Sequence, residues 1–129
     1  MKKAVLWCVA LLATSCYEVE RNCENFHTGT FSFTQVAGTE VMQSTFVRDE
    51  LYEVELFKGK KDTATIRWIN ACECVLTKLN PTSNQDKRPI SIKIIKTEGD
   101  RYTFEYALVG DLKNKQRGEI VKVSDDLEF

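Results

Sequence analysis

The chain has 129 residues and a formal net charge of −1, with 43% hydrophobic and 29% charged residues. This length suits a single domain with its own hydrophobic core. The near-neutral charge and the lack of a basic patch argue against nucleic-acid binding, because that binding depends on neutralising phosphates.

The start of the chain resembles the signal of a bacterial lipoprotein. Lys2 and Lys3 precede an apolar run over residues 4–13, which is too short to span a bilayer. The small residues "ATS" then lead directly into Cys16, as in a lipobox. The resemblance implies that residues 1–15 are a cleaved signal peptide and that Cys16 carries a diacylglycerol. An ordinary secretory signal peptide is the alternative.

The segment that follows is polar and acidic. Residues 16–26 contain "YEVERNCEN", which predicts a lipidated tether between the membrane and a folded domain over residues 27–129. Two or more acyl chains anchor a protein stably. We therefore expect a protein held to a membrane of the bacterial cell envelope by the lipid on Cys16, with the outer membrane favoured.

Residues 27–129 alternate between apolar and polar side chains with a period of two, which is typical of strands with one buried face. Turn sequences such as "AGT", "KGKKD" and "NPTSNQD" separate the runs. The pattern predicts an all-β fold, an antiparallel meander of seven or eight strands that forms a small, closed or partly open, lipocalin-like barrel. A two-sheet sandwich is the alternative. The predicted strands are about 28–36, 40–48, 51–58, 62–69, 73–79, 90–97, 101–109 and 117–123.

The strand at 51–58 has apolar residues at one parity, Tyr52, Val54 and Leu56. The alternation predicts that these residues face the core and that Glu53 and Glu55 face solvent. This interpretation disfavours a pair of catalytic carboxylates of the glycosidase kind.

The run over residues 62–79 is long for one strand, and a hairpin near Asn70 would divide it. A two-residue loop at Asn70 and Ala71 would mix charged and apolar residues on both faces. A three-residue loop over 70–72 pairs Trp68 with Cys74, and it separates the two faces better. We favour the second register, in which Cys74 enters the core and Cys72 lies at the hairpin tip.

The cysteines favour one disulfide. If Cys8 leaves with the signal peptide and Cys16 is lipidated, three of the five cysteines remain. A bond between Cys23 and Cys72 would close a long loop and is favoured in an oxidising compartment. A bond from Cys23 to Cys74, or no stable bond, remains an alternative.

Other chemistry receives little support from the sequence. Cys23, His27, Cys72 and Cys74 could form a zinc site, but one residue between paired cysteines is not the usual spacing. A redox pair at Cys72 and Cys74 is disfavoured, because Glu73 would raise the pKa that a catalytic thiol needs lowered. His27 is the only histidine and has no nucleophile in a recognised motif. We expect no catalytic residue, no metal and no cofactor, and hence no enzyme.

Aromatic side chains provide the one open question about a binding site. Six of them have inward parity, and they would either fill the barrel core or line a cavity for an apolar ligand. In the second case Trp68 would form the floor. The candidate cavity residues are Phe31, Phe33, Tyr52, Trp68, Phe104 and Tyr106.

The lipobox, "ERNC" and "RWINACECVLT" together make the chain similar to a family of small lipoproteins from Bacteroidota-type bacteria. That family has no established activity. Similar chains sometimes carry a topoisomerase IV label, which this short, acidic sequence without ATP-binding or DNA-cleaving motifs does not support. We expect a non-enzymatic envelope module that binds a small apolar ligand or an envelope partner. A structural or assembly accessory, or a periplasmic inhibitor of a cell-wall hydrolase, is the alternative.

Overall fold

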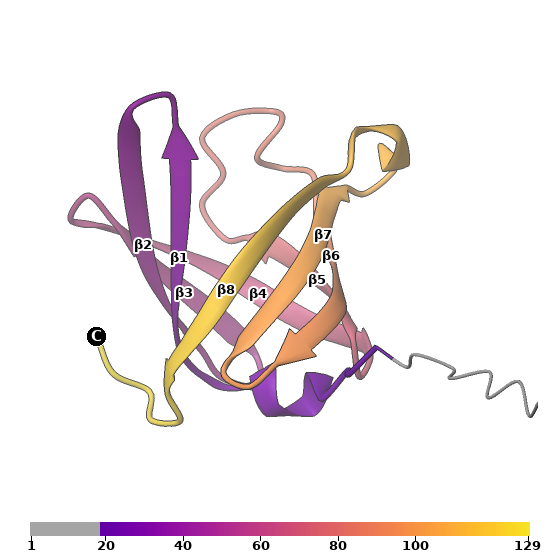
Figure 1. The fold of residues 1–129 in the computed structure, drawn as a ribbon. Coiled ribbons are helices and arrows are strands. Elements are labelled where there is room, and N and C mark those ends of the chain that lie inside the picture. Colours follow the sequence, from indigo (N-terminus) through magenta and orange to yellow (C-terminus); the bar gives the residue numbers. More distant parts are fainter. Residues whose placement is uncertain (1–18) are drawn as a thin grey trace, which may run out of the picture.

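The computed structural model describes residues 19–129, which form a closed antiparallel barrel of eight strands (Figure 1). Each strand pairs with its sequence neighbours, and β8 closes the barrel against β1. The predicted meander is confirmed, and each predicted strand limit lies within two residues of the observed one. The strands are β1 Gly29–Ala37, β2 Glu40–Arg48, β3 Tyr52–Phe57, β4 Lys60–Asn70, β5 Glu73–Lys78, β6 Ile90–Glu98, β7 Arg101–Leu108 and β8 Gln116–Ser124.

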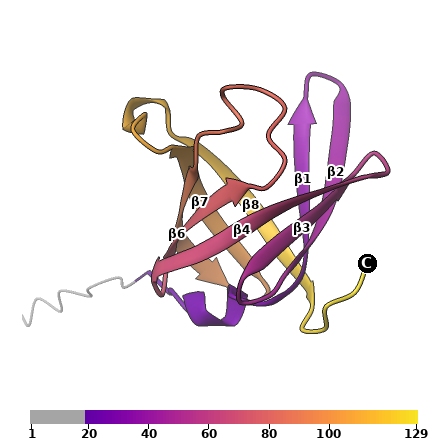
Figure 2. The ribbon, with the colours of Figure 1, turned by 180° about the vertical axis from the view of Figure 1, so that it is seen from behind.

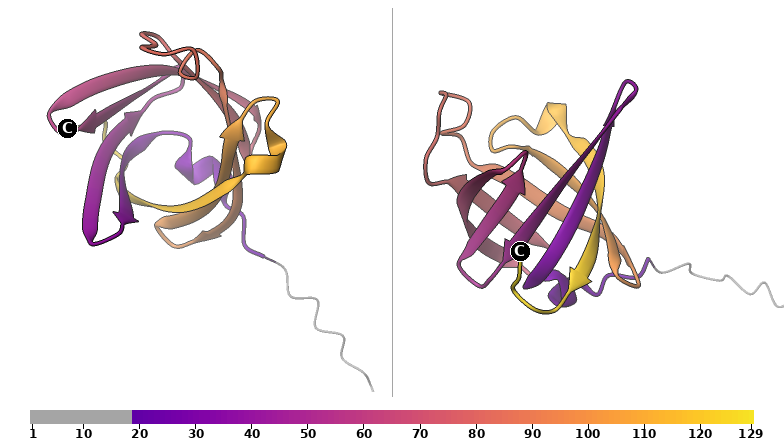
Figure 3. Two further views of the ribbon diagram at one scale, coloured as in Figure 1. Left: turned by 90° about the horizontal axis from the view of Figure 1, so that it is seen from above. Right: turned by 90° about the vertical axis from the view of Figure 1, so that its left-hand side faces the viewer.

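The two ends of the barrel differ. One end has only the short connections β2–β3, β4–β5 and β6–β7, and the 3-10 helix η1 (Cys23–Phe26) lies across it (Figure 3). We call this the closed end. The other end has the projecting β1–β2 hairpin and the longer loops at residues 79–89 and 109–115 (Figure 2). Because these loops extend beyond the strands without crossing the barrel axis, we call it the open end.

The β4–β5 hairpin has the predicted register. Trp68 pairs with Cys74 and Ile66 with Leu76. The loop itself is shorter than predicted, because Asn70 pairs with Glu73 and leaves two residues in the turn. A bulge between Trp68 and Asn70 absorbs the extra residue and restores the register.

The prediction for β3 was wrong. Glu55 pairs directly with Phe46, whose side chain is buried, and Glu53 pairs with the buried Arg48. Directly opposed residues on antiparallel strands share a face, so both glutamates point into the barrel. Tyr52 accordingly lies on the outer face, where 43% of it is exposed. The pairing with β2 therefore overrides the apolar pattern of β3.

The predicted tether also differs from the structure. The backbone NH of Thr97 donates to the carbonyl oxygen of Glu20, and the Thr97 hydroxyl accepts a hydrogen bond from the backbone NH of Asn22. Cys23 and Phe26 are buried, at 2% and 1% exposure. Residues 20–26 thus belong to the folded domain, and we call them the end cap.

Side chains fill the closed half of the barrel most tightly. Its buried residues include Phe26, Phe31, Phe46, Ile94 and Tyr102. These side chains pack as aromatic pairs, with the Phe31 and Phe46 rings stacked at 5.1 Å between centroids.

The predicted signal peptide and the lipidation site at Cys16 lie outside the described residues. Over residues 19–129 the structure contains no helix of the length and apolar character that crossing a bilayer requires.

Candidate functional site

The closed end is fastened by a disulfide between Cys23 of the end cap and Cys72 of the β4–β5 turn. This is the favoured pairing of the sequence analysis. The two residues are 49 positions apart, so the bond joins the start of the domain to a turn in the middle of the chain. The end cap is therefore tied covalently to the wall that it covers.

A buried cation lies directly beneath the end cap. The Arg48 guanidinium donates to the carbonyl oxygen of Phe26 at 2.8 Å and to the hydroxyl of Tyr102 at 3.3 Å. It also forms an ion pair with Glu53 at 3.4 Å. Burial alone lowers the pKa of the Arg48 guanidinium, but Tyr102 and Glu53 more than reverse this and raise it. Arg48 therefore stays charged and connects the end cap to two strands.

Trp68 belongs to this closed end as well. The imidazole of His27 stacks on the indole at 3.7 Å between ring centroids. The His27 ring nitrogen Nε2 lies 2.7 Å from the carbonyl oxygen of Ala71, so that the nitrogen donates a hydrogen bond in the turn that carries Cys72. Both side chains are thus used in packing the end cap, and Trp68 is not the floor of an accessible cavity.

Cys74 is a free thiol inside the barrel, with 1% exposure. Burial raises the pKa of the Cys74 thiol to about 12, so at neutral pH it is protonated and a poor nucleophile or metal ligand. The zinc site weighed in the sequence analysis also loses Cys23 and Cys72, which are bonded to each other. Within residues 19–129 no three histidine, cysteine, aspartate or glutamate side chains are grouped so as to hold a metal ion.

These buried acids predict a loss of stability at alkaline pH. Burial also raises the pKa of the Tyr102 hydroxyl to about 12 from 10.0, while the Cys74 thiol starts from 9.0. An unfolded chain releases both protons earlier than the folded one, so the free energy of unfolding should fall as the pH rises from about 9 to about 12.

Urea denaturation between pH 7 and 11 measures this effect, with a Tyr102→Phe variant as the comparison. The variant should show a shallower decline above pH 10 than the native chain. Equal slopes for the two proteins would contradict the assignment.

A layer of apolar side chains separates the two halves of the barrel. Phe104 is 5% exposed, and its ring meets Phe33 edge to face at 6.0 Å. Gly118 makes this layer fit, because a Cβ atom there would lie 2.7 Å from the Phe104 ring and 3.1 Å from Phe33. Ile66 and Ile120, each 5% exposed, belong to the same buried cluster, and the layer of Phe104 and Phe33 forms the floor of the open half.

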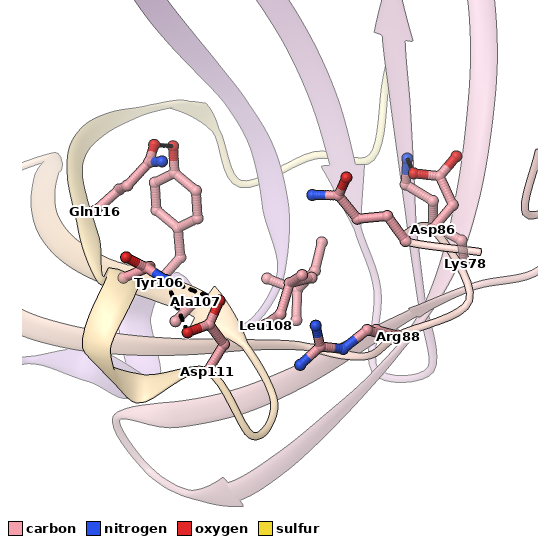
Figure 4. A pocket seen from close by; sticks show the side chains of 11 residues that line it. Lys78, Asp86, Arg88, Tyr106, Ala107, Leu108, Asp111 and Gln116 are labelled. Carbon is pink, nitrogen blue, oxygen red and sulfur yellow. Dashed lines mark hydrogen bonds and ion pairs between the residues drawn. The ribbon is translucent and has the colours of Figure 1, made fainter. Parts of the chain in front are cut away.

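One cavity of the open end lies between the loops at 79–89 and 109–115 and has a volume of about 300 Å³ (Figure 4). We call it the mouth cavity. Its walls combine apolar and charged groups. Its lining residues are Lys78, Gln85, Asp86, Arg88, Ile90, Tyr106, Ala107, Leu108, Asp111, Asn114 and Gln116.

Polar side chains of the mouth cavity hold one another in place. The Tyr106 hydroxyl donates to the side-chain oxygen of Gln116 at 2.7 Å (Figure 4). The Lys78 ammonium lies 3.5 Å from Asp86 and 3.5 Å from Asp62. Arg88 donates to the carbonyl oxygen of Val109 at 3.0 Å and thereby joins the two loops.

A second hollow of about 160 Å³ lies on the opposite wall and is lined by β1, β2 and β3. We call it the Glu55 recess. It contains one ionisable group, Glu55, which remains accessible to solvent. Partial burial, followed by the charges of Glu53 and Asp62, raises the pKa of the Glu55 carboxyl above its ordinary value. The lining residues are Phe33, Gln35, Met42, Ser44, Glu55 and Phe57.

The six candidate cavity residues are divided by the structure. Phe31 and Trp68 pack in the closed half, while Tyr52 lies on the outer face. Phe33 lines the Glu55 recess, Tyr106 lines the mouth cavity, and Phe104 packs in the floor between them. Only these three lie in or beneath the open half.

Sequence reasoning missed the charged groups of the interior. Arg48, Glu53 and Glu55 all have inward positions. The available signal was the pairing of the 40–48 and 51–58 strands through a short turn. If Phe46 faces the core, Arg48 shares its parity, and the opposed residues Glu53 and Glu55 must follow.

No protein-family model matches the chain, and comparisons with curated proteins and with solved structures give no significant match. The fold and the site geometry are therefore the basis for assigning a function.

Proposed function

We propose that the protein is a lipid-anchored, non-enzymatic binding module of the cell envelope, lipocalin-like in its use of the barrel mouth to hold a small ligand. The observation that carries the proposal is the asymmetry of the barrel. One end is packed and joined by a disulfide, while the other has a mouth cavity of about 300 Å³. Small barrels hold single small ligands in this way.

The lining modifies the expected ligand class. A purely apolar ligand in this cavity would desolvate Lys78, Asp86 and Arg88, and desolvating charged groups is costly. The aromatic and aliphatic groups Phe33, Tyr106 and Leu108 still offer apolar contact. An amphipathic molecule fits this lining better than a hydrocarbon.

The proposed anchor gives the barrel an orientation. Glu20 is hydrogen-bonded to Thr97 at the closed end, only four residues after Cys16. Four extended residues reach about 14 Å at most. A lipid on Cys16 would therefore hold the closed end near the membrane, and the mouth would face away from it toward the aqueous side.

The ligand site can be tested by NMR with a ¹⁵N-labelled protein that lacks the signal peptide and has Cys16→Ser. Small amphipathic probes such as butanol and butylammonium should shift amide signals at the open end, for example those of Met42, Leu108 and Gln116. Amides at the closed end, such as that of Arg48, should not move.

Shifts confined to the closed end or to the outer face would overturn the proposed site. A chain with Leu108→Trp, which fills the mouth cavity, serves as the control and should reduce the shifts there. Its closed-end amides should keep their native positions and so show that the fold is intact.

The anchor predicts a simple change of location. In the native host, or in a bacterium with lipoprotein processing, the chain with Cys16→Ser should move from the membrane fraction to the soluble envelope fraction. It should also lose incorporation of a labelled fatty acid. Retention in the membrane with no incorporated label in either chain would contradict lipidation.

A second candidate function, contact with an envelope protein, is favoured by the β1–β2 hairpin. Val36 and Val41 pair across its two strands with 67% and 69% exposure, and the hairpin projects past the barrel rim (Figure 1). Exposed apolar pairs are common on monomeric surfaces, so this candidate ranks second. A failure of every probe to shift the open-end amides would favour it.

A further inference from the structure

We infer that the Glu55 recess is the subsite for the positive charge of the ligand, an organic ammonium ion whose hydrocarbon part contacts Phe33, Met42 and Phe57. This inference rests on the proposed function, ligand binding at the barrel mouth, and it adds the charge of the ligand and the wall that receives it.

The recess has the composition of a site for an organic cation. Glu55 supplies the single ionisable group, and Phe33 and Phe57 supply aromatic surface on the neighbouring walls. Aromatic faces attract ammonium ions, and a carboxylate provides a charge-assisted hydrogen bond. Met42 adds an adaptable apolar contact.

Glu55 is available for such a partner. Its carboxylate has no hydrogen bond or ion pair with any described residue, in contrast to Glu53, which pairs with Arg48. Lys78, whose charge acts on the Glu55 carboxyl, forms its ion pairs with Asp62 and Asp86, at 3.5 Å from each. No cation among the described residues therefore forms an ion pair with Glu55.

The lining of the recess favours a cation over an anion. Glu55 is the only charged side chain among the residues that line it. A hard metal ion is a poor match, because it prefers several oxygen ligands and the recess walls are mostly apolar and aromatic. An organic ammonium ion uses both the carboxylate and these walls.

The experiment compares three probes of the same carbon skeleton, butylammonium chloride, butanol and sodium butyrate, by NMR titration of the ¹⁵N-labelled domain. Butylammonium should bind about tenfold more tightly than butanol, because a charged hydrogen bond is added, and butyrate should bind most weakly. The recess amides of Met42 and Glu55 should report the binding. In a domain labelled with ¹³C as well, the carboxyl signal of Glu55 should titrate at lower pH when butylammonium is bound.

The Glu55→Gln variant should lose the preference for butylammonium over butanol and keep its affinity for butanol. Glu24→Gln is the matched control, since Glu24 is exposed at the closed end and its side chain makes no contact with a charged partner among residues 19–129. It should retain the full preference.

The outcomes separate the two proposals. If butanol and butyrate shift the open-end amides as strongly as butylammonium, the ligand site stands and the cation subsite is wrong. A preference that survives in Glu55→Gln also overturns the subsite. If none of the three probes moves an open-end amide, both the subsite and the proposed ligand function fail.

Discussion

Replacement of Cys23 and Cys72 by alanine is expected to lower the free energy of unfolding by about 4 kcal/mol, because the disulfide closes a loop of roughly 50 residues. The bond restricts the unfolded chain, and in the folded state it holds the end cap, through Phe26, over Arg48 and Tyr102. Urea denaturation of the oxidised native chain and of the double variant measures the difference.

A second result of this replacement distinguishes a local effect from a global one. Once the bond is lost, the end cap is held by hydrogen bonds at Glu20, Asn22 and Phe26. Hydrogen exchange of the amides in Cys23–Phe26 should therefore accelerate more than exchange of the amides in β7 and β8. This follows because a locally opened segment exchanges without global unfolding.

The controls use the third cysteine. Cys74→Ala removes a thiol of the same kind without breaking a bond, so it should cost much less than the double variant. Native protein treated with a reductant should approach the stability of the double variant. A double variant within about 1 kcal/mol of the oxidised native chain would show that the disulfide contributes little.

Local patterns were enough to predict the barrel. Alternation with a period of two, interrupted by glycine and proline turns, placed all eight strands, because strand formation and tight turns depend on neighbouring residues. The β4–β5 register was also predictable. Of the two registers compared, the one that pairs Trp68 with Cys74 better separates charged from apolar side chains. That register in turn placed Cys72 where Cys23 could reach it.

The interior charges were not predictable from a single strand. On β3, the half-buried Val54 and Leu56 occupy the outer face, where apolar residues are tolerated. Glu53 is tolerated inside because Arg48 neutralises it, and that pairing depends on a turn in which Asp49 accepts hydrogen bonds from the backbone NH groups of Leu51 and Tyr52. The alternation of apolar and polar residues within β3 does not show how β3 aligns with β2.

The open end could not be predicted for a different reason. Whether a small barrel is filled depends on how side chains from eight strands meet in space, and the same aromatic residues can fill it or line a cavity. Here Gly118 admits Phe104 and Phe33 into one layer, and the side chains above that layer include long polar ones such as Lys78 and Gln116. The layer of Phe104 and Phe33 therefore divides the barrel into a packed half and a hollow half.

The Arg48→Met variant is expected to lose about 3–5 kcal/mol of stability, because it leaves the Glu53 carboxylate buried without a cation. The side chains of Arg48 and Glu53 are 2% and 11% exposed, so solvent cannot replace the lost partner. The variant also loses the hydrogen bond to the Phe26 carbonyl oxygen, which connects the barrel to the end cap. Denaturant unfolding at neutral pH measures the loss.

The double variant Arg48→Met with Glu53→Leu separates the cost of an unpaired charge from the value of the pair. Arg48 Nε and Glu53 Oε2 are buried without hydrogen-bond partners among the described residues, so the native pair is incompletely satisfied. Replacing both members with apolar groups should therefore recover most of the lost stability.

Tyr102→Phe is the matched control, since it removes one 3.3 Å hydrogen bond from Arg48 and should cost about 1 kcal/mol. A double variant as unstable as Arg48→Met alone would mean that Arg48 acts chiefly through the end cap. In that case the Cys23–Phe26 amides of the double variant would exchange hydrogen as fast as they do in the variant without the disulfide.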